Sequence, residues 1–282
     1  MVSVVIPCRN VQSWLPELID ALYEQDYSGE FEVIIVDNAS TDGTRVVAAS
    51  RATANHRMRV VAASDRVGAN YARNRGVMSS RGDFIAFCDG DDRVRAGWID
   101  ALVRAASVAD VVGGRIDWSR INARTAIELW GLPPRVPVVL GEEFFYGGNF
   151  GSWRSVWDAL GGFDENFRFG GTEIDFCIRA RQAGLRLLSC DDAVVDVRLR
   201  NSYASMLKRE FRIGRGLATL SAKHVHLDGR VGMVQLRRSV RAVLGAMKHH
   251  GVRSLEARRA LLAFARVTGQ YVEREDTAIL RG

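Results

Sequence analysis

The sequence predicts an α/β protein, with a mostly parallel sheet flanked by helices in residues 1–200 and a helical, basic C-terminal extension in residues 201–282. In the first part, apolar runs of strand length alternate with segments of helical spacing, which is typical of βαβ units and a parallel sheet. In the second part only the helical spacing continues. The charge balance also changes there, because residues 201–282 hold 16 Lys/Arg and 6 Asp/Glu, whereas residues 1–200 hold 23 and 27. This asymmetry indicates an acidic catalytic or metal-binding part followed by a basic segment.

The first elements follow from apolar patterning. Residues 2–6 form an apolar run closed by Pro7, and the next apolar residues recur at helical spacing: Trp14, Leu15, Leu18, Ile19 and Leu22. The same alternation predicts further strands at 31–36, 58–63, 84–87 and 110–116, and helices through 46–49, 69–77 and 98–106. Polar loops end three of these strands at Pro7–Asn10, Asp37–Thr44 and Asp89–Asp92. Since ligands of parallel sheets collect at the carboxyl ends of strands, we expect these loops to converge on one crevice.

The later part of the chain is less regular before it becomes helical. Residues 117–148 carry three prolines and several glycines, and we expect irregular, substrate-facing loops there. Helices are expected at 153–160 and 172–183, and short strands at 185–188 and 194–197. From Tyr203 onward the spacing predicts helices at 203–222, 232–249 and 253–271.

Composition limits the location and the partners of the protein. No run reaches the roughly 18 apolar residues of a membrane span, and the start of the chain lacks the basic region of a signal peptide. The four cysteines form no paired spacing, so we expect a reduced, cytoplasmic setting. The basic extension is suited to an anionic membrane surface, a nucleic acid or a partner protein, and is equally consistent with the solvated face of ordinary helices.

The acidic stretch Asp89-Gly90-Asp91-Asp92 is the strongest chemical signal, because it directly follows a buried strand. Two charges about 4 Å apart repel by roughly 4 kcal/mol at the effective dielectric of a protein surface, so three clustered carboxylates favour a cation. Oxygen ligands at the end of a strand suit Mg²⁺ or Mn²⁺, normally shared with substrate phosphates. The alternative is that one aspartate caps the next helix and the others are solvated.

Five short motifs stand in order along the chain and together resemble family 2 glycosyltransferases of the GT-A fold. They are Val4-Val5-Ile6-Pro7-Cys8-Arg9-Asn10, Val36-Asp37-Asn38-Ala39-Ser40-Thr41-Asp42-Gly43-Thr44, Ala72-Arg73-Asn74-Arg75-Gly76, Asp89-Gly90-Asp91-Asp92 and Gly161-Gly162-Phe163-Asp164-Glu165. The resemblance covers about residues 1–200 and continues weakly to about 220. It implies transfer of a sugar from a nucleotide-diphosphate donor to a hydroxyl, with inversion at the anomeric carbon.

The resemblance also implies roles for single residues. The implied nucleotide-binding residues are Pro7, Cys8, Arg9, Asp37, Asn38, Arg73, Asp89 and Gly90. Asp89 and Asp91 match the DxD pair that holds Mg²⁺ or Mn²⁺, and the acceptor side is expected to involve Asp92, Asn149 and Thr172. For Asp37 the alternative is a turn aspartate that bonds its own backbone.

Two positions depart from the family pattern. The family places its general base in a Glu-Asp pair that opens a helix, and here Gly171-Thr172-Glu173-Ile174-Asp175 puts Glu173 at the base position and Thr172 in place of the usual glutamate. The alternative is that Glu173 only complements the helix N-terminus. The second departure is Asp196, which stands where the family often has a histidine metal ligand. It is either a carboxylate ligand or a surface aspartate.

The resemblance implies a nucleotide-diphospho-sugar donor, a saccharide or lipid-linked acceptor, and no nucleic acid. The basic extension adds peripheral contact with an anionic membrane, at the inner face of the cell membrane, as an expectation. Two other functions stay open: a nucleotide-binding scaffold without turnover, which Thr172 and Asp196 allow, and a sugar nucleotidyltransferase. The second class usually has a glycine-rich first loop, which Pro7-Cys8-Arg9-Asn10 is not. The sequence does not identify the donor base or the sugar.

Overall fold

The computed structural model describes all residues except 132, 200–201, 225–226, 228–232, 252–253 and 280–282. The chain forms two compact units. The first comprises Met1–Ile121, Pro133–Glu165 and Glu173–Arg198, and the second comprises Asn122–Leu132, Asn166–Thr172 and Leu199–Gly282. The boundary expected between residues 200 and 201 lies outside the described residues, as do the expected first residues, 232 and 253, of two helices.

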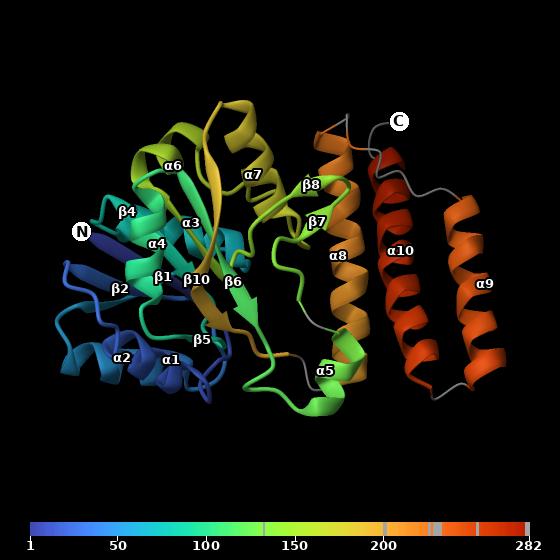
Figure 1. Cartoon of the computed structure of the whole chain (residues 1–282), viewed down its shortest axis with the longest axis horizontal. Helices are drawn as coiled ribbons and strands as arrows, with labels where there is room; N and C mark the ends of the chain where they lie inside the picture. Colours follow the sequence, from blue (N-terminus) through green and yellow to red (C-terminus); the bar gives the residue numbers. More distant parts are fainter. Residues whose placement is uncertain (132, 200–201, 225–226, 228–232, 252–253, 280–282) are drawn as a thin grey trace. The chain divides into compact units, whose positions relative to one another are not determined.

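The first unit is built on an eight-stranded sheet with the order β3-β2-β1-β4-β9-β6-β10-β5 (Figure 1). Its strands are β1 (Val2–Cys8), β2 (Phe31–Asp37), β3 (Met58–Ala62), β4 (Phe84–Cys88), β5 (Arg93–Val94), β6 (Val111–Asp117), β9 (Asn149–Trp153) and β10 (Leu187–Asp196). The β3-β2-β1-β4 half is parallel, as is the β6–β10 pair, whereas β9 runs antiparallel to both β4 and β6, and β5 antiparallel to β10. The mostly parallel α/β architecture expected from the sequence is confirmed.

Helices cover both faces of the sheet, because the strand residues alternate between two apolar clusters. Val4 and Ile6 pack on one face with the buried side chains of α1 (Leu15–Tyr23) and α4 (Trp98–Ala106), and α2 (Thr44–Ala54) adds Ala48. Val5 points to the other face, which is covered by α3 (Ala69–Ser79), α6 (Arg154–Leu160) and α7 (Thr172–Gln182). Period-two alternation along each strand is what permits cores on both sides of one sheet.

Strand register brings three loops together at the carboxyl end of the sheet. Cys8 at the end of β1 pairs with Asp37 at the end of β2, and Val5 pairs with Phe87 near the end of β4. The acidic loop therefore passes over the end of β1. A Cβ added at Gly90 would lie 2.7 Å from the Cys8 Sγ atom, so this close passage requires glycine.

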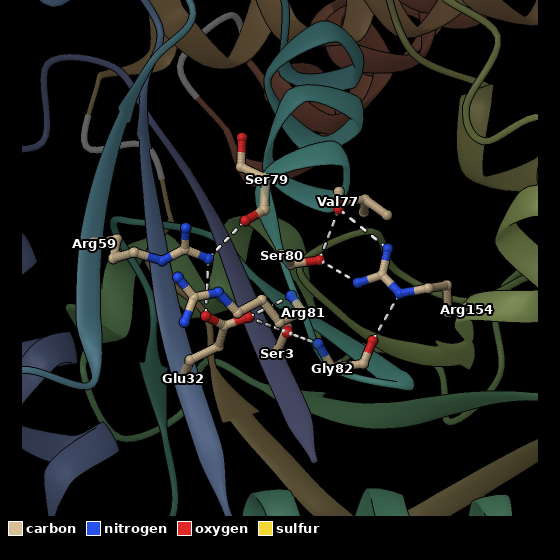
Figure 2. Close-up of polar contacts among 9 residues, drawn as sticks. All are labelled: Ser3, Glu32, Arg59, Val77, Ser79, Ser80, Arg81, Gly82 and Arg154. Atoms are coloured by element: carbon tan, nitrogen blue, oxygen red, sulfur yellow. Dashed lines mark hydrogen bonds and ion pairs between the residues drawn. The ribbon is translucent and has the colours of Figure 1, made fainter.

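A polar cluster joins the opposite, amino ends of the same strands (Figure 2). The buried Glu32 carboxylate of β2 accepts hydrogen bonds from the Ser3 hydroxyl at 2.7 Å, the Arg81 backbone N–H at 2.6 Å and the Arg59 guanidinium at 2.9 Å. Arg154 donates to the Gly82 carbonyl at 2.8 Å and so connects α6 to the segment before β4. Every partner of Glu32 comes from a different strand or connection, so the cluster fixes the amino ends relative to one another.

The structure differs from the sequence prediction in two places. Residues 117–148 are not wholly irregular, because they contain α5 (Arg124–Trp130) and the small hairpin of β7 (Val138–Val139) and β8 (Glu142–Glu143). The expected strands at 185–188 and 194–197 are one strand, β10, with an irregularity between Cys190 and Val194. A bulge interrupts the alternation of apolar residues, which is why the sequence reads as two short strands.

The second unit contains α5, α8 (Tyr203–Lys223), α9 (Met233–His250) and α10 (Leu255–Ile279). Helices α8 and α10 pack closely, because a Cβ at Gly214 would lie 1.8 Å from the Arg266 carbonyl oxygen and one at Gly269 would lie 1.9 Å from that of Phe211. The buried Glu210 of α8 pairs with Arg266 of α10, with 2.6 Å between Oε2 and Nε. Among the residues that the structure describes, no helix has the length and apolar character needed to span a bilayer.

Candidate active site

The acidic loop that follows β4 holds carboxylates in two different environments. Asp89 is partly exposed and Asp91 is half-buried, whereas Asp92 is buried. Burial, followed by the charges of Asp91 and Asp89, raises the pKa of Asp92 well above its usual range. The repulsion among these clustered carboxylates creates a negative potential that favours a cation at this point.

Arg73 of α3 connects the acidic loop to the expected base. Its Nη2 atom donates to Asp89 Oδ1 at 2.7 Å, and its Nη1 atom donates to Glu173 Oε1 at 3.3 Å. The arginine itself is buried, whereas the side chains of Asp89 and Glu173 are 37% and 24% exposed. The guanidinium also lies over the Phe163 ring, 5.7 Å from its centre. One buried cation therefore orients two carboxylates that both face solvent.

Gly147 and Gly148, in the segment before β9, lie directly beneath these carboxylates. A Cβ at Gly147 would come within 2.3 Å of Glu173 Oε1 and 3.0 Å of Arg73 Nη1. One at Gly148 would come within 2.7 Å of Asp89 Oδ2. Any larger residue at either position would displace these carboxylates. The two glycines therefore leave the space that the side chains of Asp89 and Glu173 occupy.

The loops after β1 and β2 form the expected nucleotide side. Asn10 and Ala39 both have φ of 56°, in the left-handed region, and the Asn10 side chain accepts the Thr41 backbone N–H at 2.8 Å. Non-glycine residues with positive φ are uncommon and often mark functional turns. Asp37 is buried and accepts the Ser40 backbone N–H at 3.3 Å, which is the turn contact considered above as its alternative role.

Asn38, also expected to bind nucleotide, uses its side chain to hold the next loop. Its Nδ2 atom donates to the carbonyls of Ala63 at 2.5 Å and Arg66 at 2.8 Å, and its Oδ1 atom accepts the Gly68 N–H at 2.7 Å. The amide thus positions the segment that leads from β3 into α3. Arg73 stands on that helix, so Asn38 supports the site from behind. Pro7 and Cys8 lie at the end of β1 against Gly90, and Arg9 is exposed beside them.

Arg198, just beyond β10, holds the acidic loop from its other side. Its backbone N–H donates to Asp92 Oδ1 at 2.9 Å, its Nε donates to the Asp91 carbonyl at 3.0 Å, and its Nη2 donates to Glu17 Oε2 at 2.9 Å. The guanidinium also lies over the Trp14 ring. These contacts fix the loop without using the Asp91 carboxylate.

Helix α7 carries two acids with different surroundings. Asp175 is fully buried and pairs with Arg179, whose Nε lies 2.8 Å from Asp175 Oδ2. Arg179 also donates to the carbonyls of Leu160 at 2.7 Å and Gly162 at 2.8 Å. Asp175 therefore belongs to a structural clamp. Glu173, two residues earlier and so on the other side of the helix, is partly exposed. Thr172 is buried at the start of the helix.

Asp196, expected as a metal ligand, and Asn149, expected on the acceptor side, are both buried and bond other groups of the protein. Asp196 is buried and its carboxylate pairs with Arg95, which also donates to Asp117 Oδ2 at 2.8 Å. Asn149 has no exposed surface: its Oδ1 accepts the Trp98 Nε1–H at 2.8 Å and its Nδ2 donates to the carbonyls of Arg115 at 2.8 Å and Ala193 at 2.9 Å. The Asp196 contacts therefore connect β10 to β6 through Arg95, and the Asn149 contacts connect β9 to α4 and to neighbouring strands.

The acidic loop is chemically suited to Mg²⁺ or Mn²⁺. Within the described part of the chain, no three His, Cys, Asp or Glu side chains are arranged as a complete metal-binding group. Such a group is not required, because Mg²⁺ in nucleotide enzymes is usually held by one or two carboxylates together with substrate phosphates. Asp89 and Asp91 provide oxygen donors that are not fully buried, so the residues present fit a cation shared with a diphosphate.

Three site residues were not expected from the sequence: Arg198, Gly147 and Gly148. Arg198 stands two residues after Asp196, which was expected to be a metal ligand. An arginine so close to an expected ligand was a sequence signal for a second site residue. The Gly147-Gly148 pair directly precedes β9, and a glycine pair beside a buried segment indicates close approach of another chain segment.

Comparisons with known proteins identify the family of the chain. The model of the family Glycosyl transferase family 2 matches residues 3–186. The chain is 28% identical over 221 residues to glycosyltransferase AglE of Haloferax volcanii, which covers 76% of this chain and 72% of the relative. It is 27% identical over 245 residues to the amylovoran biosynthesis glycosyltransferase AmsB of Erwinia amylovora, which covers 81% of this chain and 79% of the relative.

Among solved structures, the chain is similar to the mannosyltransferase PcManGT of Pyrobaculum calidifontis in complex with GDP-Man and Mn²⁺. The TM-score is 0.69 at 20% identity, and the match covers 97% of this chain and 86% of the other. Identity this low carries the fold alone. The GT-A fold expected from the sequence is confirmed by this similarity.

Proposed function

Since the chain belongs to glycosyl transferase family 2 and is a glycosyltransferase, we propose that it moves a sugar from a nucleotide-diphosphate donor to a hydroxyl acceptor with inversion, in the presence of Mg²⁺ or Mn²⁺. One observation carries the proposal. Arg73 holds Asp89 of the acidic loop and Glu173 of α7 at the same end of the sheet, with distances of 2.7 and 3.3 Å. The Arg73 guanidinium thus holds a donor-side carboxylate and a candidate base next to each other. A displacement reaction needs this proximity, because the acceptor must lie beside the donor.

In the proposed reaction Glu173 is the general base. Its carboxylate takes the proton of the acceptor hydroxyl while that oxygen forms a bond to the anomeric carbon and the bond from that carbon to the diphosphate oxygen breaks. Glu173 is supported over its neighbour Asp175 by exposure, because the Asp175 carboxylate is fully buried against Arg179. A base must reach the acceptor proton, and only the exposed carboxylate of α7 has such access.

The donor would be bound by the loops after β1, β2 and β4. Pro7, Cys8 and Arg9 would line the nucleotide, Asp37 would accept from its base, and Asp89 and Asp91 would hold the metal. A bound Mg²⁺ or Mn²⁺ would neutralise the charge that develops on the departing diphosphate. PcManGT binds GDP-Man and Mn²⁺, and a second similar structure, S. aureus TarS, binds UDP-GlcNAc. Guanosine and uridine diphosphates are therefore the first nucleotides to test. For the acceptor we propose a saccharide, free or linked to a lipid.

The proposal is tested by incubating the protein with a panel of nucleotide-sugars and Mn²⁺ and measuring release of nucleoside diphosphate, with and without chelator. We expect release from at least one donor, reduced by chelator and accelerated by acceptor. A scaffold without turnover would bind the nucleotide and release nothing. A sugar nucleotidyltransferase would instead form or consume nucleoside triphosphate in the presence of a sugar phosphate.

A further inference from the structure

We propose that the solvent-facing side of α9 docks this protein onto an anionic membrane surface. This side, called the α9 face, consists of Val234, Arg237, Val240, Arg241, Leu244 and Lys248. The inference rests on the proposed function in one respect: docking at a membrane would bring the protein to a lipid-linked acceptor. Its physical basis is independent of any reaction.

The α9 face is one continuous strip of a helix. Its six members follow one another at spacings of one, three or four residues, which places them on one side of a 3.6-residue helix. All six are exposed, and the exposed fractions of Val234, Val240 and Leu244 are 59%, 39% and 60%. Val243 points the other way and is buried, and α9 lies alongside α10 (Figure 1). The helix therefore packs by one side and presents the other.

The charged residues of α9 are all basic. Between Met233 and His250 the sequence has no Asp or Glu. In the portion of the chain that the structure describes, no carboxylate forms an ion pair with Arg237, Arg241 or Lys248. Some arginines of α8 and α10 do have acidic partners: Arg215 pairs with Glu273 at 2.5 Å and Arg266 pairs with Glu210. Among the described residues of the second unit, α9 is the helix that combines such basic residues with exposed large aliphatic side chains.

The chemistry of the α9 face selects its partner. Its basic residues gain from negative charge, and its three aliphatic side chains gain only from an apolar phase. A nucleic acid backbone provides the first and not the second. The interface of an anionic bilayer provides both, because phosphate headgroups lie directly above the acyl chains, and helices that lie in this interface combine Lys/Arg with exposed aliphatic residues.

The test is co-sedimentation of the full chain with vesicles of phosphatidylcholine, alone or mixed with phosphatidylglycerol. We expect binding to the mixed vesicles only, weakened by salt. The triple variant R237Q/R241Q/K248Q should bind more weakly by about fivefold per charge, on the order of 10²-fold in total. L244S should also weaken binding but keep the salt dependence. A matched control is R45Q/V46S on α2, where an exposed arginine stands beside a valine that is 73% exposed, and it should bind like the parent.

Several outcomes would overturn the proposal. Equal binding to both vesicle types, or unchanged binding of the triple variant, would remove the α9 face as the docking surface. Self-association of the parent that L244S abolishes, without vesicle binding, would assign the face to a second copy. Binding of a DNA duplex that needs the arginines and ignores Leu244 would assign it to nucleic acid.

The result is separable from the proposed reaction. E173Q should bind vesicles like the parent even if transfer is lost, and the α9 variants should keep donor turnover in solution. Thermal unfolding of each variant shows whether it is folded.

Discussion

Arg73 is the residue that unites the candidate site, because its buried guanidinium bonds Asp89 and Glu173 at the same time. Burying an arginine is costly unless its charge is compensated, and here two acids compensate it. In return each acid is held in a defined direction. Asp89, proposed for the donor side, and Glu173, the proposed base, are thereby connected through one side chain, and substitutions of Arg73 should affect both.

The first prediction concerns the base. Glu173→Gln keeps the shape and hydrogen-bonding capacity of the side chain but cannot take a proton, so we expect kcat to fall by about 10²–10⁴-fold. Donor affinity, measured by calorimetry, should stay within a few-fold of the parent. Asp175→Asn is the control, because it weakens the clamp with Arg179 and should lower Tm instead. Normal turnover of Glu173→Gln, together with a folded but inactive Asp92→Asn variant, would move the base to Asp92.

The second prediction concerns Arg73. Arg73→Lys keeps the positive charge but loses the planar fork that reaches two carboxylates, so Asp89 and Glu173 should no longer be oriented together. We expect a turnover loss of at least about tenfold, since misplacement of reacting groups by about 1 Å can cost 10²-fold. Arg75→Lys, two residues along the same helix and over the Tyr71 ring, is the matched control. Equal kcat values for the two variants would exclude the positioning role.

What the sequence could predict at this scale depended on local motifs. Asp89 and Glu173 belong to short patterns with recognisable neighbours, so the sequence alone predicts them as candidates, and both contact Arg73 in the structure. The support given by Arg198 was not, because its contact with Asp92 joins residues 106 positions apart and no local pattern encodes it. Asn149 shows the converse. Its position in the chain suggested the acceptor, whereas its amide bonds Trp98 and two backbone carbonyls inside the fold.

At the scale of elements, the Glu32 cluster fixes the amino ends of the strands (Figure 2). Burial alone would raise the pKa of Glu32, but hydrogen bonds from Ser3 and the Arg81 backbone and the charge of Arg59 outweigh it and lower that pKa below 4.5. A carboxyl with a lowered folded-state pKa stabilises the fold above its unfolded-state pKa. This stabilisation is lost as the pH falls through the folded-state value.

The third prediction follows from this linkage. Glu32→Gln should reduce the free energy of unfolding by about 1–3 kcal/mol at neutral pH, because it removes the charged acceptor from a buried cluster. Since glutamine does not titrate, the difference from the parent should shrink as the pH falls below 4.5. Urea unfolding of both proteins across pH measures it. Glu30→Gln, at an exposed neighbouring position, should change stability by less than about 0.5 kcal/mol. A difference that grows in acid would contradict the linkage.

The parallel strands could be predicted from the sequence, whereas β9 could not. Runs such as Val33–Val36 are apolar throughout, as expected for strands buried on both faces. β9 reads Asn149-Phe150-Gly151-Ser152-Trp153, and glycine, asparagine and serine are poor strand formers. It is held in place by tertiary contacts instead, with β4 and β6 on its two sides and Phe150 stacked on Phe87 at 4.7 Å. Such contacts are absent from any local window of sequence.

At the scale of the whole molecule, the charges divide between an acidic first part and a basic second part. In the first unit, Asp89, Asp91 and Asp92 lie together at the carboxyl end of the sheet, where they favour a cation. In the second unit, α9 carries basic residues and no Asp or Glu, beside exposed aliphatic side chains. The net charge of +6 is therefore the sum of an acidic region and a basic region, and each is suited to a partner of the opposite charge.

The last prediction measures the acidic surface through the stability of the whole chain. A ligand that binds only the folded state at a hundredfold excess over its Kd adds about 2.7 kcal/mol, which corresponds to a rise in Tm on the order of 5 °C. We expect this rise for GDP or UDP with Mn²⁺, and a smaller one with chelator. Asp91→Asn removes a proposed metal ligand, so its Tm with nucleotide and Mn²⁺ should fall to the value that both proteins show with nucleotide and chelator. Asp83→Asn, an exposed acid just before β4, should respond like the parent. An equal Mn²⁺-dependent rise in Asp91→Asn and the parent would show that the metal is held elsewhere.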